Sequence, residues 1–150
     1  MTAHDEHWMR EAIELARRGE SEGEVPVGAV VVIADTPLGR SWNCPISSND
    51  PTAHAEILAL RQAAAAVQNY RLEDATLYST LEPCVMCAGA LVAARVRRLV
   101  FGTRDLRFGA VRSKFRAADS ELLNHRVEVV EGILAAECVQ LLQQFFERRR

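Results

Sequence analysis

The alternation of hydrophobic and polar positions along the chain predicts four helices. Residues 5–18 place apolar side chains at helical spacing with charges between them, as in an amphipathic helix. Helices are also expected over residues 53–67, which follow a loop of helix-capping residue types, and over the alanine-rich residues 84–94. The last helix, residues 133–149, has an apolar stripe that consists of Leu134, Cys138, Leu141, Leu142 and Phe145.

Five segments have the composition of β-strands. The first, Val25–Ile33, is β-branched and almost continuously apolar, which is typical of a buried strand. After a turn at residues 34–37, Leu38–Trp42 can pair back against it as a second strand. Three further strands are expected at Ala75–Leu81, Arg97–Thr103 and Arg126–Gly132.

The order of these elements indicates an α/β fold. Strand–helix–strand units imply parallel pairing, with helices on both faces of one sheet. We therefore predict a three-layer α/β/α fold around a mixed five-stranded sheet, with a long loop and one helical turn over residues 104–124. The sequence has no repeat, low-complexity tract or linker, so residues 1–150 are expected to form a single domain. Loops at strand ends and helix N-termini are the expected place for a site.

The composition is that of a soluble globular protein without a global excess of positive charge. Hydrophobic residues make up 49% and charged residues 25%, and the net charge is −2. Arg148, Arg149 and Arg150 nevertheless form a basic tip, which suits either an anionic partner or the negative end of a helix. No targeting signal is visible, and the longest uncharged stretch, Pro83–Ala94, is shorter than the about 20 residues that span a bilayer. We therefore expect a cytoplasmic protein without membrane contact.

The cysteine spacing favours a metal site over a disulfide. Of the four cysteines, only Cys84 and Cys87 are close in sequence, and a reducing cytosol disfavours a disulfide framework. This pair follows Pro83 at an expected helix start, where the free N–H groups and the helix dipole favour thiolates on one face. His54 begins another expected helix and supplies a third ligand. Three protein ligands leave one position for water, which is the pattern of a catalytic zinc.

Glu56 stands two positions after His54 and has a different expected role. Residues i and i+2 on a helix do not face each other, so Glu56 is a poor second ligand beside His54. A carboxylate near the metal but not bound to it can move protons to and from a water made acidic by zinc. A lone C-x-x-C could instead be redox-active or buried, and a structural zinc would need a fourth ligand.

These motifs resemble a known enzyme family. The "HAE" of residues 54–56 and the "PCVMC" of residues 83–87 are similar to the H-x-E…P-C-x-x-C signature of the zinc-dependent cytidine deaminase-like superfamily. Segments such as "VPVGAV", "DPTAHAEI" and "FFERRR" extend the resemblance to bacterial tRNA-specific adenosine deaminases, from about Trp8 to Arg150. That family converts the wobble adenosine of an anticodon to inosine. The resemblance implies a cytidine deaminase-like fold, one zinc ion per subunit and a homodimer.

The resemblance also implies a role for each residue of the active site. His54, Cys84 and Cys87 would bind zinc, and Glu56 would shuttle protons while water attacks C6 of adenine and ammonia leaves. Asn43 would hydrogen-bond the flipped base. Val27, Ala55 and neighbouring apolar residues would form the wall of its pocket. Backbone groups near Glu82, Pro83 and Cys84 would also meet the substrate.

Further residues match family positions that contact RNA. Asp105 would contact the ribose of a neighbouring nucleotide, and Phe146, Arg149 and Arg150 would touch the anticodon stem-loop, with an arginine tRNA as the expected partner. Each has a plainer interpretation from the residues alone: Asp105 and Asn43 also suit turns, and Phe146 suits a core or a dimer contact.

The segment Leu106–Asp119 departs from the commoner form of the resembled family, because Arg107 stands where a lysine is frequent and Arg112 and Lys114 add positive charge. The added charge could strengthen contacts with an RNA backbone or accompany a changed substrate. Two other functions therefore stay open. One is a deaminase of a free nucleobase or nucleoside such as guanine, and the other is a non-catalytic RNA-binding subunit with a structural zinc.

Overall fold

A computed structural model gives the architecture of the chain, and it describes residues 2–149. Five strands form a single sheet in the order β2-β1-β3-β4-β5. Strand β1 pairs antiparallel with both β2 and β3, whereas β3–β4 and β4–β5 are parallel. The predicted mixed five-stranded sheet is confirmed. The strands are β1 (Gly28–Ile33), β2 (Thr36–Trp42), β3 (Thr76–Leu81), β4 (Arg98–Thr103) and β5 (Glu128–Glu131).

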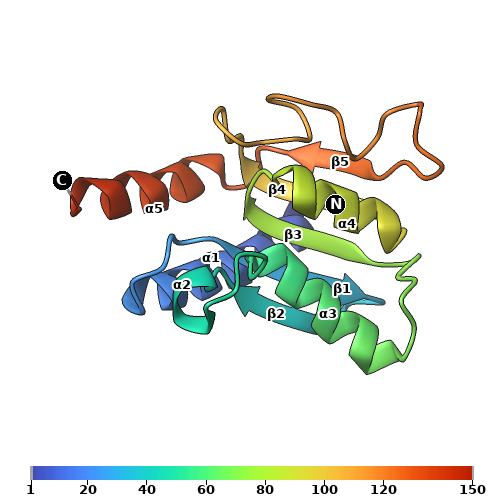
Figure 1. Cartoon of the computed structure of the whole chain (residues 1–150), viewed down its shortest axis with the longest axis horizontal. Helices are drawn as coiled ribbons and strands as arrows, with labels where there is room; N and C mark the ends of the chain where they lie inside the picture. Colours follow the sequence, from blue (N-terminus) through green and yellow to red (C-terminus); the bar gives the residue numbers. More distant parts are fainter. Residues whose placement is uncertain (1, 150) are drawn as a thin grey trace.

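Helices cover both faces of this sheet, as the order of elements predicts. Figure 1 shows α3 and α4 in front of the sheet and α1 behind it, while α5 reaches away from the sheet towards the C-terminus. The helices are α1 (Thr2–Ser21), α2 (Pro45–Ser48), α3 (Ala55–Val67), α4 (Val85–Ala93) and α5 (Ala135–Glu147). Within residues 2–149, no helix combines the length and apolarity that a membrane span requires.

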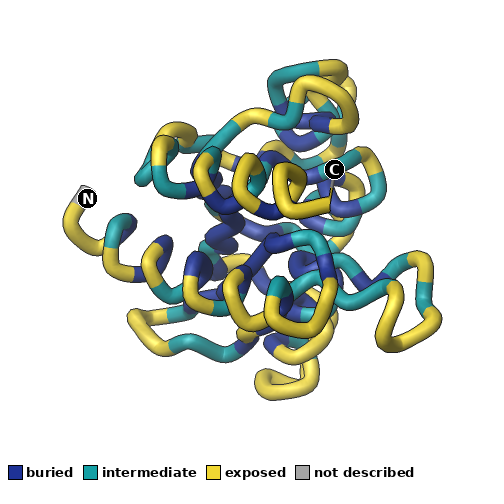
Figure 2. The backbone as a smooth tube through the Cα atoms, turned by 90° about the vertical axis from the view of Figure 1, so that its left-hand side faces the viewer, coloured by how far each residue is buried: buried dark blue, intermediate teal, exposed yellow. Residues whose placement is uncertain are grey.

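Two cores follow from the alternation of side chains along the strands. Val31, Leu77 and Leu99 point to the face covered by α3 and α4, whereas their neighbours Val30 and Val100 point to the face covered by α1 and α5. Figure 2 shows the resulting interior, with buried backbone in the centre and exposed backbone on the outer helical turns. The sheet is thus buried on both sides, which explains why β1, β3 and β4 read as nearly continuous apolar runs.

The predicted helices and strands all have boundaries within three residues of those expected, and the remaining differences have local causes. The short helix α2 has only four residues, too few for a periodic pattern. The first strand begins at Gly28 and not at Val25, because the N–H of Val27 bonds to the carbonyl of Val25 in a tight turn. Gly28 also lies so close to the carbonyl of Ala12 that a side chain would collide with α1.

The connection between β4 and β5 contains no helix. Residues 104–127 are turns and coil, close to the predicted loop of residues 104–124. In Figure 1 this connection loops out above β4 and β5. The connection is the crossover between the parallel strands β4 and β5, and such crossovers usually contain a helix.

Candidate metal centre and its surroundings

His54, Cys84 and Cys87 come together at the N-termini of α3 and α4. Nδ1 of His54 lies 3.5 Å from Sγ of Cys84 and 3.5 Å from Sγ of Cys87. His54 and Cys84 are the residues that precede the first turn of α3 and of α4, and both have extended backbones. All three ligand atoms lie within 4.8 Å of one another, and no other His, Cys, Asp or Glu of residues 2–149 joins them. The arrangement fits a metal site with three protein ligands.

The protons of this cluster are unevenly shared. A hydrogen bond from Cys87, supported by His54, lowers the pKa of the Cys84 thiol to about 4 against the opposing effect of burial. The pKa of Cys87 is raised, first by the same hydrogen bond and then by burial. The hydrogen bond with Cys84 also raises the pKa of His54. The cluster therefore concentrates negative charge on sulfur, which a bound cation would neutralise.

Glu56 lies beside this cluster in the first turn of α3. Its side chain is buried, with an exposed fraction of 4%. Burial raises its pKa to about 7, although its own backbone N–H and the neighbouring His54 favour the charged form. A carboxyl group with a pKa near neutrality can both accept and donate a proton under physiological conditions. Its position and its environment are thus those expected of a proton shuttle.

Asn43, Val27 and Ala55 lie around the same end of the sheet. The N–H of Asn43 donates to the carbonyl of Val27, 3.0 Å away, so the ends of two strands are joined there. The next residue, Cys44, donates to the carbonyl of Ala53, which directly precedes His54. Val27 and Ala55 are buried, and Asn43 is half-buried. The structure therefore brings the expected base-binding residues to the segment that carries the metal cluster.

The side chain of Glu82 has a structural task that the sequence did not indicate. Its buried carboxylate accepts hydrogen bonds from the backbone N–H groups of Asp105, Val111, Arg112 and Ser113 and from the hydroxyl of Ser113. Burial alone would raise the pKa of Glu82, but these donors outweigh it and keep the pKa below its usual value. The carboxylate holds the long loop against the end of β3.

The main chain around Pro83 continues this attachment. The carbonyl of Pro83 accepts from the N–H of Ala110, and Cys84 pairs with Gly109 in an isolated antiparallel bridge. A side chain at Gly109 would collide with the carboxylate of Glu82, so a glycine is required there. Substrate contact by the backbone at Glu82 and Pro83 stays a prediction, and the carbonyl of Pro83 already has a partner within the chain.

Asp105 forms a turn in this loop. One oxygen of its carboxylate accepts from the N–H groups of Arg107 and Phe108, each 3.1 Å away. This is the turn-forming role that the residue type suggests. Contact between Asp105 and a ribose stays a prediction.

The predicted RNA-binding tip lies at the end of α5. Phe146 is half exposed, whereas Phe145 is buried, as expected for the core residue of the pair. The guanidinium of Arg149 lies 3.6 Å from the centre of the Phe145 ring. Arg150 is outside the described residues. Phe146 and Arg149 are both exposed, and they are neighbours because the N–H of Arg149 donates to the carbonyl of Phe146.

Comparison with known proteins identifies the family. A MafB19-like deaminase family model matches residues 3–150. A protein from Haemophilus influenzae named tRNA-specific adenosine deaminase is 54% identical over 147 residues, which cover 97% of this chain and 85% of the relative. The chain belongs to the tRNA-specific adenosine deaminase family.

Solved structures of other deaminases have the same fold as the present protein. A structure from a study of A-to-I editing by tRNA:A34 deaminases at the wobble position is 42% identical, with a TM-score of 0.87, and the match covers 91% of this chain and 99% of that one. A guanine deaminase from Nitrosomonas europaea is 26% identical, with a TM-score of 0.78, over 93% of this chain and 83% of that one. The predicted cytidine deaminase-like fold is confirmed.

Glu24 is a second buried carboxylate of the deaminase that sequence reasoning missed. It accepts hydrogen bonds from the N–H groups of Ile46 and Ser47, at 3.3 and 2.7 Å. These groups begin α2, immediately after Asn43 and Cys44. Glu24 thereby fixes the backbone that follows Asn43. No periodic pattern marks it, because it stands alone before an apolar strand.

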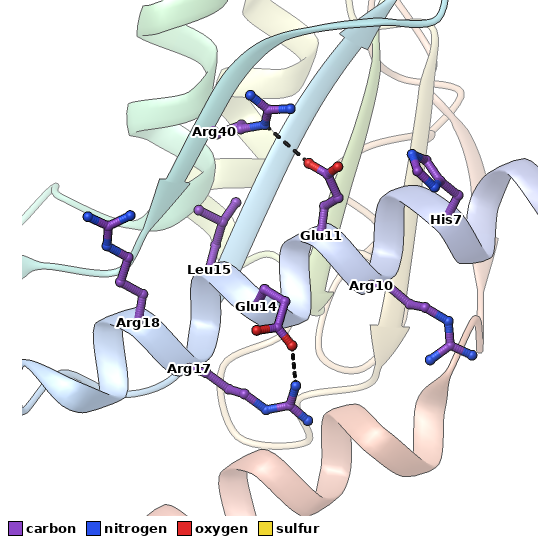
Figure 3. Close-up of a pocket in the computed structure, with 8 residues that line it drawn as sticks. All are labelled: His7, Arg10, Glu11, Glu14, Leu15, Arg17, Arg18 and Arg40. Carbon is purple, nitrogen blue, oxygen red and sulfur yellow. Dashed lines mark hydrogen bonds and ion pairs between the residues drawn. The ribbon is translucent and has the colours of Figure 1, made fainter.

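A surface hollow of the deaminase lies along α1 and beside Arg40 of the outer strand β2. Figure 3 shows it lined by charged side chains, with ion pairs between Arg40 and Glu11 and between Arg17 and Glu14. Arg10 is paired with Glu137 on α5, and Arg18 lies over the ring of Trp42. Three of the four arginines that line this hollow are thus paired with carboxylates, and none of its lining residues belongs to the metal cluster.

Proposed function

We propose that the protein hydrolyses the wobble adenosine of a tRNA anticodon loop to inosine and ammonia. The observation that carries this proposal is the buried Glu56 beside the cluster of His54, Cys84 and Cys87 in a member of the tRNA-specific adenosine deaminase family. A structural metal site has no need of that carboxylate. The solved structure with 42% identity comes from a study of A-to-I editing by tRNA:A34 deaminases at the wobble position, which supports the choice of substrate.

The metal we propose is zinc, one ion per subunit. Two sulfurs and one imidazole nitrogen form a donor set that zinc prefers. With Zn–N near 2.0 Å and Zn–S near 2.3 Å, tetrahedral geometry puts N and S about 3.5 Å apart. The observed separations from Nδ1 of His54 to the two sulfurs are 3.5 Å. The three side chains thus fit the ion with little movement.

The residues around the cluster would divide the chemistry among them. A bound zinc supplies Lewis-acid chemistry and makes water acidic enough to act as a nucleophile at neutral pH. Glu56 takes a proton from the attacking water and delivers one to the amino nitrogen that leaves C6, so adenosine plus water gives inosine and ammonia, with the bond to the ribose unchanged. Asn43 reads the purine edge, because an amide both donates and accepts. Val27 and Ala55 exclude water from one side of the base.

The proposal is tested by measuring inosine in an anticodon stem-loop with a wobble adenosine. An arginine tRNA sequence is the first choice, with free adenosine and free guanine as parallel substrates. Inosine in the stem-loop alone is the expected result. Turnover of guanine with an inert stem-loop would overturn the proposal in favour of nucleobase deamination, an activity with a structural counterpart at lower identity. Zinc binding without any turnover would favour the non-catalytic RNA-binding subunit.

Zinc itself is tested by removal and replacement. Dialysis against a chelator should abolish deamination, and one equivalent of Zn²⁺ should restore it, whereas Mg²⁺ should not, because Mg²⁺ prefers oxygen ligands. Full activity in protein whose metal content has fallen well below one equivalent would contradict the assignment.

We also infer a homodimer of single-domain subunits that works where tRNA is found, in the cytoplasm. The family model spans residues 3–150, which supports one deaminase domain. An apolar hollow between α3 and α4 suits a second copy, and it is lined by side chains such as Ile57, Ala64, Tyr70 and Ala93. Tyr70 is largely exposed in the single chain. Sedimentation of the wild type and of Tyr70→Glu would test the dimer: the variant should sediment as a monomer.

A further inference from the structure

The loop between β4 and β5 exposes aromatic rings among positive charges. The exposed fractions are 65% for Phe108 and 62% for Phe115. Residues 106–116 contain four basic residues and no acidic one, in a chain whose net charge is −2. Large apolar side chains that stay in water, interleaved with cations, are typical of a surface that binds single-stranded nucleic acid.

The two rings belong to one small structure. The N–H of Lys114 donates to the carbonyl of Gly109, 2.9 Å away, so the residues next to Phe108 and Phe115 are joined across a backbone hydrogen bond. The guanidinium of Arg107 lies 5.5 Å from the centre of the Phe108 ring. We call residues 106–116 the aromatic loop.

Not every cation of the aromatic loop is free to meet an anion. Arg112 makes a bidentate pair with Asp119, and Arg116 lies 3.6 Å from the same carboxylate. Arg107 and Lys114 have no ion-pair partner within residues 2–149. These two cations stand directly beside Phe108 and Phe115, so each ring has an available positive charge as its neighbour.

The aromatic loop is fixed next to the metal cluster. Gly109 pairs with Cys84, one of the proposed ligands, and residues that face each other in an antiparallel bridge have Cα atoms roughly 5 Å apart. The carboxylate of Glu82 holds the backbone on both sides of this bridge. A base on Phe108 would therefore lie within a nucleotide or two of a base at the metal.

We propose that Phe108 and Phe115 form a stacking platform for the unpaired bases that flank the target adenosine, while Arg107 and Lys114 hold the adjoining phosphates. This inference rests on the proposed function and deepens it. Bases in an anticodon loop are unpaired and can turn outward onto an aromatic ring. Stacking tolerates any base, so the platform would position the loop without reading its sequence.

The first test compares Phe108→Ala, Phe115→Ala and the double variant with the wild type on the anticodon stem-loop. Each truncation should raise KM and Kd by roughly 5- to 100-fold, the range that loss of one stacked base produces, and leave kcat within about threefold. Phe108→Tyr keeps the ring and should retain wild-type KM. Leu122→Ala removes a side chain of the same connection that is 96% exposed, and it should change nothing.

A stem-loop with 2-aminopurine beside the target reports stacking directly. Its fluorescence should fall when the wild type binds, and the fall should disappear in the double variant and persist in Phe108→Tyr. Arg107→Gln and Lys114→Gln should each flatten the dependence of log Kd on log salt by about 0.7, the value for one phosphate contact on a single strand. A structural role for the rings would move neither the fluorescence nor the salt slope.

The outcomes separate this inference from the proposed function. If the wild type forms inosine in the stem-loop and the double variant keeps its KM, its Kd and its fluorescence change, the platform is wrong and the proposed function stands. If the double variant instead loses dimer mass in sedimentation with unchanged RNA binding, the surface belongs to a second copy and the RNA platform is overturned. If the wild type forms no inosine in RNA, the proposed function and the platform fall together.

Discussion

The guanidinium of Arg98, at the start of β4, donates two hydrogen bonds to the carboxylate of Asp5 in α1, at 3.2 and 3.1 Å. The hydroxyl of Tyr78 donates to the same carboxylate. Asp5 is buried, and the side chain of Arg98 is mostly buried. The carboxylate of Asp5 thereby joins the first helix to two strands, through the ion pair with Arg98 of β4 and the hydrogen bond from Tyr78 of β3, at the opposite end of these strands from the metal cluster.

Breaking this pair should destabilise the fold. Asp5→Asn is expected to lower the free energy of unfolding by about 3 kcal/mol, the lower end for a broken buried pair, because Arg98 keeps Glu128 as a second partner. Urea denaturation measures the difference. Glu14→Gln is the control, since the pair of Glu14 with Arg17 is exposed and should contribute less than about 1 kcal/mol. Equal losses in both variants would contradict the assignment.

The same pair gives a pH dependence with a definite sign. Burial alone would raise the pKa of Asp5, but the hydrogen bonds from Arg98 and Tyr78 outweigh it and lower the pKa below 3.8. The stabilisation is therefore complete above pH 3.8 and is lost as the pH falls towards the lower pKa of the folded state. The difference in unfolding free energy between wild type and Asp5→Asn should shrink over that range. A difference that stays constant down to pH 2 would contradict it.

Glu56→Gln should separate chemistry from metal binding. The substitution preserves shape and removes the proton shuttle, so deamination of the stem-loop should fall roughly 100- to 10,000-fold. Zinc content, measured by mass spectrometry, should stay at one equivalent, because Glu56 is outside the ligand set. Loss of zinc from this variant would mean that Glu56 supports the metal and is not a dedicated shuttle.

Glu82→Ala should loosen the loop that it holds. The substitution leaves four buried or half-buried backbone N–H groups and one hydroxyl without their acceptor, so we expect a loss of about 3 kcal/mol in unfolding free energy. Amide exchange in residues 105–113 should accelerate. Glu131→Gln, which removes an exposed partner of Arg104, is the control and should leave that exchange unchanged. Unchanged exchange in Glu82→Ala would rule out the anchoring role.

The C-terminal tip should contribute to RNA affinity and not to metal binding. Deletion of residues 146–150 is expected to weaken stem-loop binding about tenfold or more, while zinc content is retained. Arg149→Gln should reduce the salt slope by up to about 0.7, and Arg148→Gln by less, because Glu20 already neutralises part of the charge on Arg148. Unchanged affinity after the deletion would exclude the tip from RNA recognition.

Elements with a regular apolar pattern, and residues with distinctive chemistry, could be predicted from the sequence. The strands β1, β3 and β4 are buried on both faces, and their apolar runs are visible without a structure. The grouping of His54, Cys84 and Cys87 could be predicted because two cysteines three apart and a histidine, each at a helix start, together form the donor set of a zinc site. The long connection could be identified as a loop because its periodicity is weak.

The carboxylates of Glu24 and Glu82 could not be predicted in the same way. Their partners are backbone N–H groups, which are present at every residue except proline and leave no mark in the sequence. The helix α2 was missed for a related reason, because four residues make only one turn. Residues that hold loops in place therefore emerge only from three-dimensional contacts, even when they decide where the reactive groups stand.

The anchoring of the long loop by Glu82 separates two kinds of change. Four of its five donors belong to the main chain, so the side chains that face outward from this loop can be exchanged without removing the attachment. Mutation can then alter which molecule is recognised while the catalytic apparatus keeps its geometry. If this loop recognises RNA as proposed, its outward side chains and its attachment can change independently, and one scaffold could acquire different substrates by surface mutation alone.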